Sequence, residues 1–160
     1  MEVVRSTSFV MAKPLFKQPI NMLTGNEIKC AECGGNYIKT TGKVLFEVRE
    51  VPIEIDNIEH HVCAKCGEML FRGDVVSKLQ RLANEKYKKR HGIMSSSRIR
   101  ALRQKHGITQ ETFETIIGAG AKSVARWEKG TVIHSEVTDT FFKVLERFPE
   151  AMYWLLGDQK

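Results

Sequence analysis

Four cysteines, arranged in two pairs of equal spacing, are the residues of this chain with the most readable chemistry. Cys30 and Cys33 form one pair, Cys63 and Cys66 form the other, and 29 residues separate them. The chain of 160 residues has no other cysteine. A C-x-x-C turn aims two thiolates at one point, and the glycines that follow each pair let backbone amides turn toward the sulfurs. We therefore predict a closed tetrahedral site in which four sulfurs hold one structural zinc ion.

Other uses of four cysteines fit this sequence less well than structural zinc. Two disulfides would suit a secreted protein, but residues 1–7 lack the uninterrupted apolar core of a secretory signal. A thioredoxin-type redox site needs one such pair rather than two, and catalytic zinc keeps a coordination position open that four cysteines would fill. A rubredoxin-like iron site uses the same ligands, so the spacing leaves zinc and iron both open. His60 and His61, just before the second pair, are interpreted as strand residues rather than ligands.

The charge of the chain is concentrated in one stretch. Residues 72–106 carry 11 Lys and Arg against 2 Asp and Glu, a balance of +9, whereas the formal net charge of the whole chain is +6. A solvated basic helix would explain such a stretch, but its confinement also favours a polyanionic partner. No segment approaches the roughly 18 apolar residues of a membrane span, so we expect a cytoplasmic protein with no membrane partner.

The patterns divide the chain into a β-rich part and a helical part. Residues 36–49 and 51–62 read as strands, with a turn or bend at 41–43 and a break at Asp56-Asn57. From Asp74, the expected cap, a helix with Val75, Val76, Leu79 and Leu82 on one face runs to His91. The predicted fold class is α+β overall, with a small zinc-bound, β-rich N-terminal domain and an all-α C-terminal domain.

The predicted domain limits follow from these patterns. Residues 1–28 are an extended or mobile arm, 29–91 the zinc domain, 92–97 a linker where any domain motion would occur, and 98–160 the helical domain. A sheet of this size needs its metal to fold. We therefore expect loss of Cys63 to unfold the front half while leaving the function of residues 95–160 largely intact.

The helical part has the order of a helix-turn-helix. Residues 98–106 form a first helix, Thr109 caps a second over 110–117, glycines at 118 and 120 make a tight turn, and a third helix covers 121–128. Val124 and Trp127 are expected to pack inward. Lys122, Ser123 and Arg126 are expected on the outer face. Glu128 is expected to pair with Arg100 or Arg103 of the first helix.

These residues carry a resemblance to known families. Those that match the lambda-repressor-like (Xre-type) signature are Ile108-Thr109-Gln110-Glu111, Gly120 and Val124-Ala125-Arg126-Trp127-Glu128-Lys129-Gly130. The two-knuckle module ahead of them resembles the MqsA (YgiT-type zinc-finger) antitoxins, and the combined resemblance covers residues 29–156. It implies that the zinc domain neutralises a ribonuclease toxin of RelE-like fold. It also implies that the helical domain dimerises and represses the shared operon by binding a palindrome.

The expected contacts to double-stranded operator DNA lie on two helices and on the basic stretch. Thr109 and Gln110 are placed to hold a phosphate at a helix N-terminus. The planar fork of Arg126 matches guanine O6 and N7, and Arg126 occupies the base-reading arginine position of the family. The best-known family member has asparagine where this chain has Lys122, which leaves the operator sequence open. The further predicted DNA contacts are Ser123, Lys129 and Arg90, and Lys86, Lys88, Lys89 and Arg90 are expected along the phosphate backbone.

The C-terminal segment carries more apolar surface than one short helix can bury. An amphipathic helix is expected over 137–148, and after Pro149 five bulky apolar residues fall within 150–156. Part of this surface would fill the domain core, and we expect the remainder to form a homodimer interface. A dimer would place two recognition helices about 34 Å apart, one turn of DNA.

The sequence thus favours an antitoxin and autorepressor rather than an enzyme. It shows no open metal site, no nucleophile beside a base and no phosphate-cradling glycine loop. The alternative is a stand-alone zinc-containing Xre-family regulator without a toxin partner.

Overall fold

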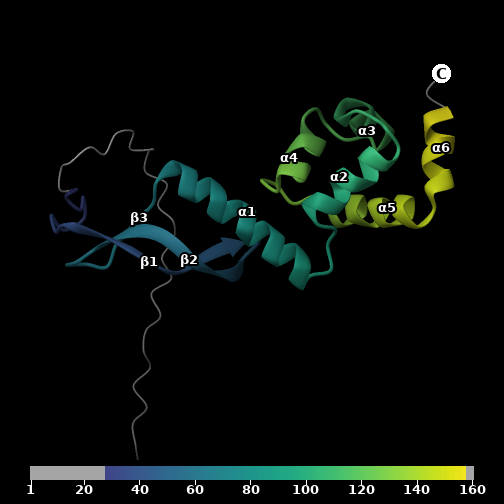
Figure 1. Ribbon diagram of the computed structural model, residues 1–160. Coiled ribbons are helices and arrows are strands. Elements are labelled where there is room, and N and C mark those ends of the chain that lie inside the picture. Colours follow the sequence, from purple (N-terminus) through teal and green to yellow (C-terminus); the bar gives the residue numbers. More distant parts are fainter. Residues whose placement is uncertain (1–27, 158–160) are drawn as a thin grey trace, which may run out of the picture.

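A computed structural model describes residues 28–157, so all but the last residue of the predicted arm lies outside the described residues (Figure 1). The fold is mixed, as predicted: a three-stranded antiparallel sheet of order β1-β2-β3 is followed by six helices in the described part. The strands are β1 (Tyr37–Val48), β2 (Val51–Cys63) and β3 (Met69–Leu70). The helices are α1 (Gly73–Arg90), α2 (Ser96–Lys105), α3 (Gln110–Ile116), α4 (Ser123–Lys129), α5 (Glu136–Arg147) and α6 (Pro149–Gly157).

The hairpin of β1 and β2 is continuous where the sequence suggested a turn or bend. The pairing shifts register between Gly42 and Val44, opposite Asn57, whose φ is +58°. This irregularity resets the alternation of the strand, so that Ile53 and Ile55 before it and Ile58 after it are all buried. The expected turn at 41–43 is therefore a bulge rather than a chain reversal. The predicted break at Asp56-Asn57 lies opposite this bulge, on β2.

Helix α1 packs along one face of the sheet (Figure 1). Its inner face is formed by Leu79, Ala83 and Tyr87, which follow each other at four-residue spacing and are at most 8 % exposed. Leu82, expected on that face, is 39 % exposed. The predicted cap is also wrong: Arg72 is the N-cap residue, no side chain caps the helix, and Asp74 lies in the first turn.

The helical part surrounds a second hydrophobic cluster. Phe113, Val124 and Phe142 are fully buried in it, together with Met152 from α6. The side chains of Ser95, Thr109 and Ser135 accept hydrogen bonds from the first turns of α2, α3 and α5. The cap at Thr109 is thus confirmed. None of the described helices has the length and apolar character needed to cross a membrane.

The segment 92–97, predicted to be a linker, carries buried side chains. Met94 is fully buried in the helical cluster, and its backbone N–H donates to Asp139 Oδ1 at 2.7 Å. Ser96 is 8 % exposed and contacts both α1 and α4. The domain division stays a prediction, but this connection is fastened on both sides by hydrogen bonds.

Candidate metal centre and nucleic-acid interface

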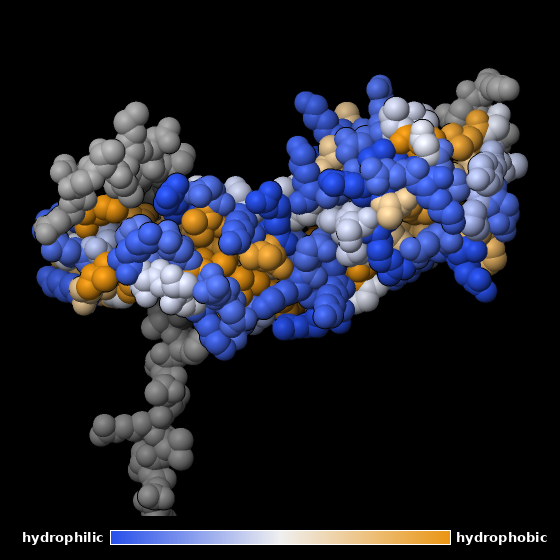
Figure 2. All heavy atoms as spheres, viewed as in Figure 1, coloured by the Kyte–Doolittle hydropathy of each residue, from blue (hydrophilic) through white to orange (hydrophobic). Residues whose placement is uncertain are grey.

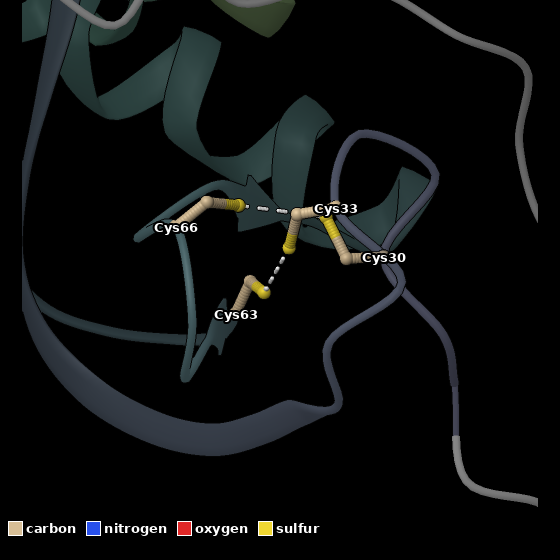
Figure 3. Close-up of side chains that lie close together, drawn as sticks. All are labelled: Cys30, Cys33, Cys63 and Cys66. Carbon is tan, nitrogen blue, oxygen red and sulfur yellow. Dashed lines mark hydrogen bonds between the residues drawn. The ribbon is translucent and has the colours of Figure 1, made fainter.

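The two cysteine pairs form two turns of the same construction (Figure 3). Gly34 N–H donates to the Cys30 carbonyl at 2.8 Å, and Gly67 N–H donates to the Cys63 carbonyl at 2.9 Å. Both glycines adopt positive φ, +69° and +76°, which a residue with a Cβ would reach only at a cost. The first turn precedes β1 and the second joins β2 to β3, so the hairpin brings both turns to the same end of the sheet.

The four sulfurs are spaced for a metal ion rather than for disulfides. The Cys33 and Cys63 Sγ atoms lie 3.4 Å apart, the Cys30 and Cys66 Sγ atoms lie 3.6 Å apart, and all four lie within 4.8 Å of one another. A disulfide would require about 2.05 Å, and all four cysteines are free. Tetrahedral zinc with Zn–S bonds of about 2.3 Å places its sulfurs about 3.8 Å apart. The observed spacing brackets that value.

Gly35 shows how tightly the backbone is held around this cluster. A Cβ on Gly35 would lie 2.8 Å from the Lys65 Cβ, 3.0 Å from the Cys63 Sγ and 3.3 Å from the Cys33 Sγ. Any side chain at residue 35 would therefore displace a sulfur or the opposite turn. The requirement for glycine comes from close approach of the backbone to the sulfurs, and it supports a shaped ligand cluster.

The acidities of the thiols show the same crowding. Burial alone would raise the pKa of Cys30, but hydrogen bonds from the Tyr37 hydroxyl and from backbone amides lower it to about 6. The backbone amide of Glu68 acts to lower the pKa of Cys66, but the sulfurs of Cys33 and Cys63 and burial raise it to about 12. A fourth negative sulfur is thus unfavourable without a cation. A bound dication would compensate this charge and fasten the two turns together.

The donor set fits a thiolate-binding ion such as zinc and does not separate zinc from iron. The two histidines stay outside the cluster: His60 is buried on the sheet, with its Nδ1 at 2.8 Å from the Ile58 carbonyl oxygen and its ring stacked on Phe71. Cys30, Cys33, Cys63 and Cys66 form the one group among residues 28–157 that could hold a metal ion. With four cysteines as ligands, zinc would have no open position for chemistry.

The candidate nucleic-acid interface begins with the two short helices α3 and α4, which lie close to the predicted ranges. Helix α4 starts at Ser123 rather than at residue 121, because Lys122 adopts a left-handed conformation with φ of +62°. Both carboxylate oxygens of Glu114, a buried residue of α3, accept from α4: the Lys122 N–H at 3.1 Å and the Val124 N–H at 3.0 Å. Sequence reasoning missed Glu114. The one signal was that no Ser, Thr, Asp or Asn stands at the N-cap of α4.

Glu128 fastens α4 to α2 and α3. Its side chain is 1 % exposed and accepts from Arg103 Nε at 2.6 Å and from Arg103 Nη2 at 3.0 Å, while Arg100 Nε lies 3.5 Å away. The predicted pairing is therefore confirmed. Burial acts to raise the pKa of Glu128, but these guanidinium groups and the Gln110 amide hold it below its ordinary value. The Gln110 amide, expected at a phosphate, donates to Glu128 at 2.8 Å instead.

The other predicted DNA contacts differ in exposure. Lys122, Arg126 and Lys129 are exposed on α4. Ser123 is 9 % exposed, so its placement on the outer face is wrong, and its hydroxyl accepts from Arg126 Nη2 at 3.3 Å. Arg126 Nε also donates to the Lys122 carbonyl at 3.2 Å, which holds the guanidinium beside the start of α4. Thr109 is exposed at the start of α3.

The basic residues of α1 do not all remain available. Arg90 is exposed, as is Lys89, but Lys88 is fully buried, so its expected contact with phosphate is wrong. Lys86 Nζ lies 3.4 Å from Asp56 Oδ2 and donates to the Glu54 carbonyl at 2.9 Å. The sequence showed that this stretch is basic without showing which charges are used inside the protein.

Comparison with known families decides the identity of the chain. Residues 28–155 match the family described as the antitoxin component of the bacterial toxin-antitoxin system, MqsA. The chain belongs to the MqsA antitoxin family. The match spans both the four-cysteine sheet and the helical part, which confirms the resemblance to the MqsA antitoxins and supports an antitoxin role in a toxin-antitoxin system. A search of curated proteins finds no match.

Proposed function

We propose that this MqsA-family antitoxin represses its own operon by placing α4 in the major groove of a palindromic operator. We further propose that its sheet, fastened by zinc, neutralises a ribonuclease toxin of RelE-like fold. The single observation that carries the first part is the surface of α4. Lys122, Arg126 and Lys129 are exposed and form no ion pair with any other described residue. The opposite side of the same helix is fixed by Val124 and Glu128.

The roles of these side chains follow from their chemistry. Arg126 presents a planar donor fork that matches the O6 and N7 acceptors of guanine. Lys122 is a compact charge suited to guanine or to phosphate. The contacts of Arg126 with the Lys122 carbonyl and the Ser123 hydroxyl restrict its rotamers, so less entropy is lost on binding a base. Ser123 then acts by positioning Arg126 rather than by touching DNA.

The C-terminal helices supply the proposed dimer surface. Tyr153 and Trp154 of α6 are 65 % and 68 % exposed, and Phe148, which ends α5, is 49 % exposed. Large apolar side chains exposed around the junction of α5 and α6 favour an interface with a second copy. A two-fold dimer would also match the symmetry of a palindromic operator.

The DNA-binding proposal is tested with a duplex spanning the region upstream of the gene for this chain. Wild-type protein is expected to shift this duplex more strongly than a scrambled duplex in a mobility-shift assay. Arg126→Ala should reduce this preference by one to two orders of magnitude, because a bidentate arginine contributes about 1–3 kcal/mol of discrimination. Arg72→Ala, which removes an exposed arginine that pairs with Asp74 at the start of α1, is the matched control. Equal preference in wild type and Arg126→Ala would refute the assignment of α4.

The toxin-binding proposal is tested separately by co-expression with the product of the adjacent gene. We expect co-purification of that product, loss of its toxicity, and failure of both when Cys63 is replaced by Ser. Specific DNA binding without any such partner would instead identify the stand-alone regulator considered above.

A further inference from the structure

Helix α1 is fastened directly to the C-terminal end of α4. Asn84 Nδ2, from a residue 5 % exposed, donates to the Gly130 carbonyl at 2.8 Å, and Gln80 Nε2 donates to the Thr131 carbonyl at 3.1 Å. The Ser96 hydroxyl lies between Glu85 of α1 and the Trp127 carbonyl of α4. These bonds satisfy carbonyls at and just after the end of α4 with side chains of α1 and α2, so they set the position of α1 relative to α4.

This junction places cationic side chains of α1 beside the end of α4. Gly130 is the C-cap of α4, and the Arg81 Cγ lies 3.9 Å from the position that a Cβ on Gly130 would occupy. Lys78 lies one turn earlier on α1, at the three-residue spacing that shares a helix face, and Lys129 immediately precedes Gly130. Lys78, Arg81 and Lys129, here called the junction patch, are all exposed.

The junction patch is not neutralised within the described part of the chain. No ion pair or side-chain hydrogen bond to another described residue involves any of its three members. The nearest acidic residues along α1 are already engaged: Asp74 pairs with Arg72, and Glu85 accepts from Lys88 and Ser96. Figure 2 shows hydrophilic residues across the junction between the sheet and the helical part.

We propose that the junction patch binds the sugar-phosphate backbone of duplex DNA and extends the contact from α4 onto α1. The proposal rests on the proposed function of α4. A recognition helix reads bases with its N-terminal residues, and its C-terminal end can lie beside the phosphate backbone. Arg81 lies next to the C-cap of α4, so it would lie beside the DNA phosphates when α4 occupies the major groove. Duplex DNA carries one negative charge per about 1.7 Å of axis, which suits several cations in a row.

The salt dependence of binding separates this surface from base reading. Lys78→Gln/Arg81→Gln is compared with wild type by fluorescence anisotropy, using the upstream duplex and a scrambled duplex at several KCl concentrations. Each phosphate contact contributes about 0.9 to the log-log salt slope. We expect the slope to fall by about 1.8 per bound protomer on both duplexes. The loss of affinity between 50 and 200 mM KCl should become about twelvefold smaller, with the preference for the upstream duplex unchanged.

Three further variants test whether the change in salt slope comes from the charges of the junction patch. Arg81→Lys keeps the charge and should restore the slope at that position, whereas Arg81→Glu should weaken binding to both duplexes. Lys39→Gln removes an exposed cation from β1, where it pairs with Glu59, and should leave the slope unchanged. Circular dichroism should show wild-type folding in all of them, because the replaced side chains are exposed.

The outcomes distinguish this proposal from the proposed function. An unchanged slope in Lys78→Gln/Arg81→Gln, with Arg126→Ala still losing preference, would refute the junction patch alone. Altered preference without a change in slope would also refute it, since phosphate contacts carry no sequence information. Wild-type protein that binds neither duplex would overturn both proposals.

Discussion

Lys88 offers a sharp test of the contact between α1 and the helical part, because its charge is enclosed at that contact. Its side chain is fully buried, and its Nζ lies 2.9 Å from Glu85 Oε1 and 2.8 Å from Ser96 Oγ. We predict that Lys88→Met lowers the free energy of unfolding, since methionine retains much of the apolar stem but cannot satisfy either oxygen. A buried polar residue of this kind is stable only while its partners are present.

The magnitude follows from the exposure of the two partners. Breaking a fully buried ion pair costs about 3–5 kcal/mol, but the Glu85 side chain is 38 % exposed and water can replace part of the interaction. The single proton of the Ser96 hydroxyl can still be donated to Glu85 or to the Trp127 carbonyl. We therefore expect a loss of about 2 kcal/mol, between the cost of a lost charged hydrogen bond and that of a broken buried pair.

Urea unfolding monitored by tryptophan fluorescence measures this loss. Trp154→Phe is introduced into every variant, so that Trp127, whose carbonyl belongs to the same contact, is the only reporter. Lys89→Met is the matched control: this neighbouring lysine is exposed and has no described partner, so its change should stay within about 0.5 kcal/mol. A loss in Lys88→Met no larger than in Lys89→Met would refute the reasoning.

The pH dependence of the same variant gives a second check. Burial acts to raise the pKa of Glu85, but hydrogen bonds from Ser96 and Lys88 hold it below its ordinary value of 4.5. A carboxylate with a lowered folded pKa stabilises the protein above its unfolded pKa, and this contribution is lost as the pH falls toward the folded pKa. The difference in the free energy of unfolding between wild type and Lys88→Met should therefore be largest at pH 7 and decrease below about pH 4.5. A pH-independent difference would show that Lys88 acts by packing alone.

Three further predictions concern the other parts of the molecule. Cys63→Ser should unfold the sheet, as seen by circular dichroism. It should also weaken binding to DNA about tenfold, since α1 would no longer hold its two proposed phosphate contacts. Unchanged DNA affinity would instead show that the helical part binds DNA independently of the sheet. Glu128→Gln should cost about 2–4 kcal/mol in urea unfolding, because the Arg103 guanidinium loses its charged partner. The loss in free energy of unfolding should become smaller below about pH 4.5, because protonation of Glu128, whose pKa is lowered in the folded protein, removes its stabilising charge from the wild type. Tyr153→Ser/Trp154→Ser should sediment as a monomer at concentrations where wild type is a dimer, and a monomeric wild type would contradict the proposed interface.

Local patterns predicted most of the elements. The C-x-x-C spacing indicated the cluster because two matching turns at the ends of a hairpin leave their sulfurs few other arrangements. The start of α3 was visible because Thr109 caps its own helix, whereas α2 begins at Ser96, two residues before the predicted start. The expected pairing of Glu128 with Arg100 or Arg103 of the first helix is observed with both arginines.

The features that the sequence did not predict depend on how separate elements dock against one another. The amides at the start of α4 are satisfied by Glu114 of α3, a residue that looks like an ordinary surface glutamate in its own helix. The break in β2 became a bulge because β1 shifts register at the same place. Lys88 looked like its exposed neighbours, and only the docking of α2 and α4 encloses it.

The basic stretch shows why a charge balance alone does not define a binding surface. Of the 11 Lys and Arg within residues 72–106, several are committed to carboxylates of this chain. These are Arg72, Lys86, Lys88, Arg98, Arg100 and Arg103, which pair with Asp74, Asp56, Glu85, Glu146 and Glu128. The remainder have no acidic partner among residues 28–157, namely Lys78, Arg81, Lys89, Arg90 and Lys105. Of these, Arg81 has its stem beside the C-cap of α4, with Lys78 one turn away. The charge available to a polyanion is therefore smaller than the sequence indicates, and part of it lies next to the helix that is proposed to read the bases.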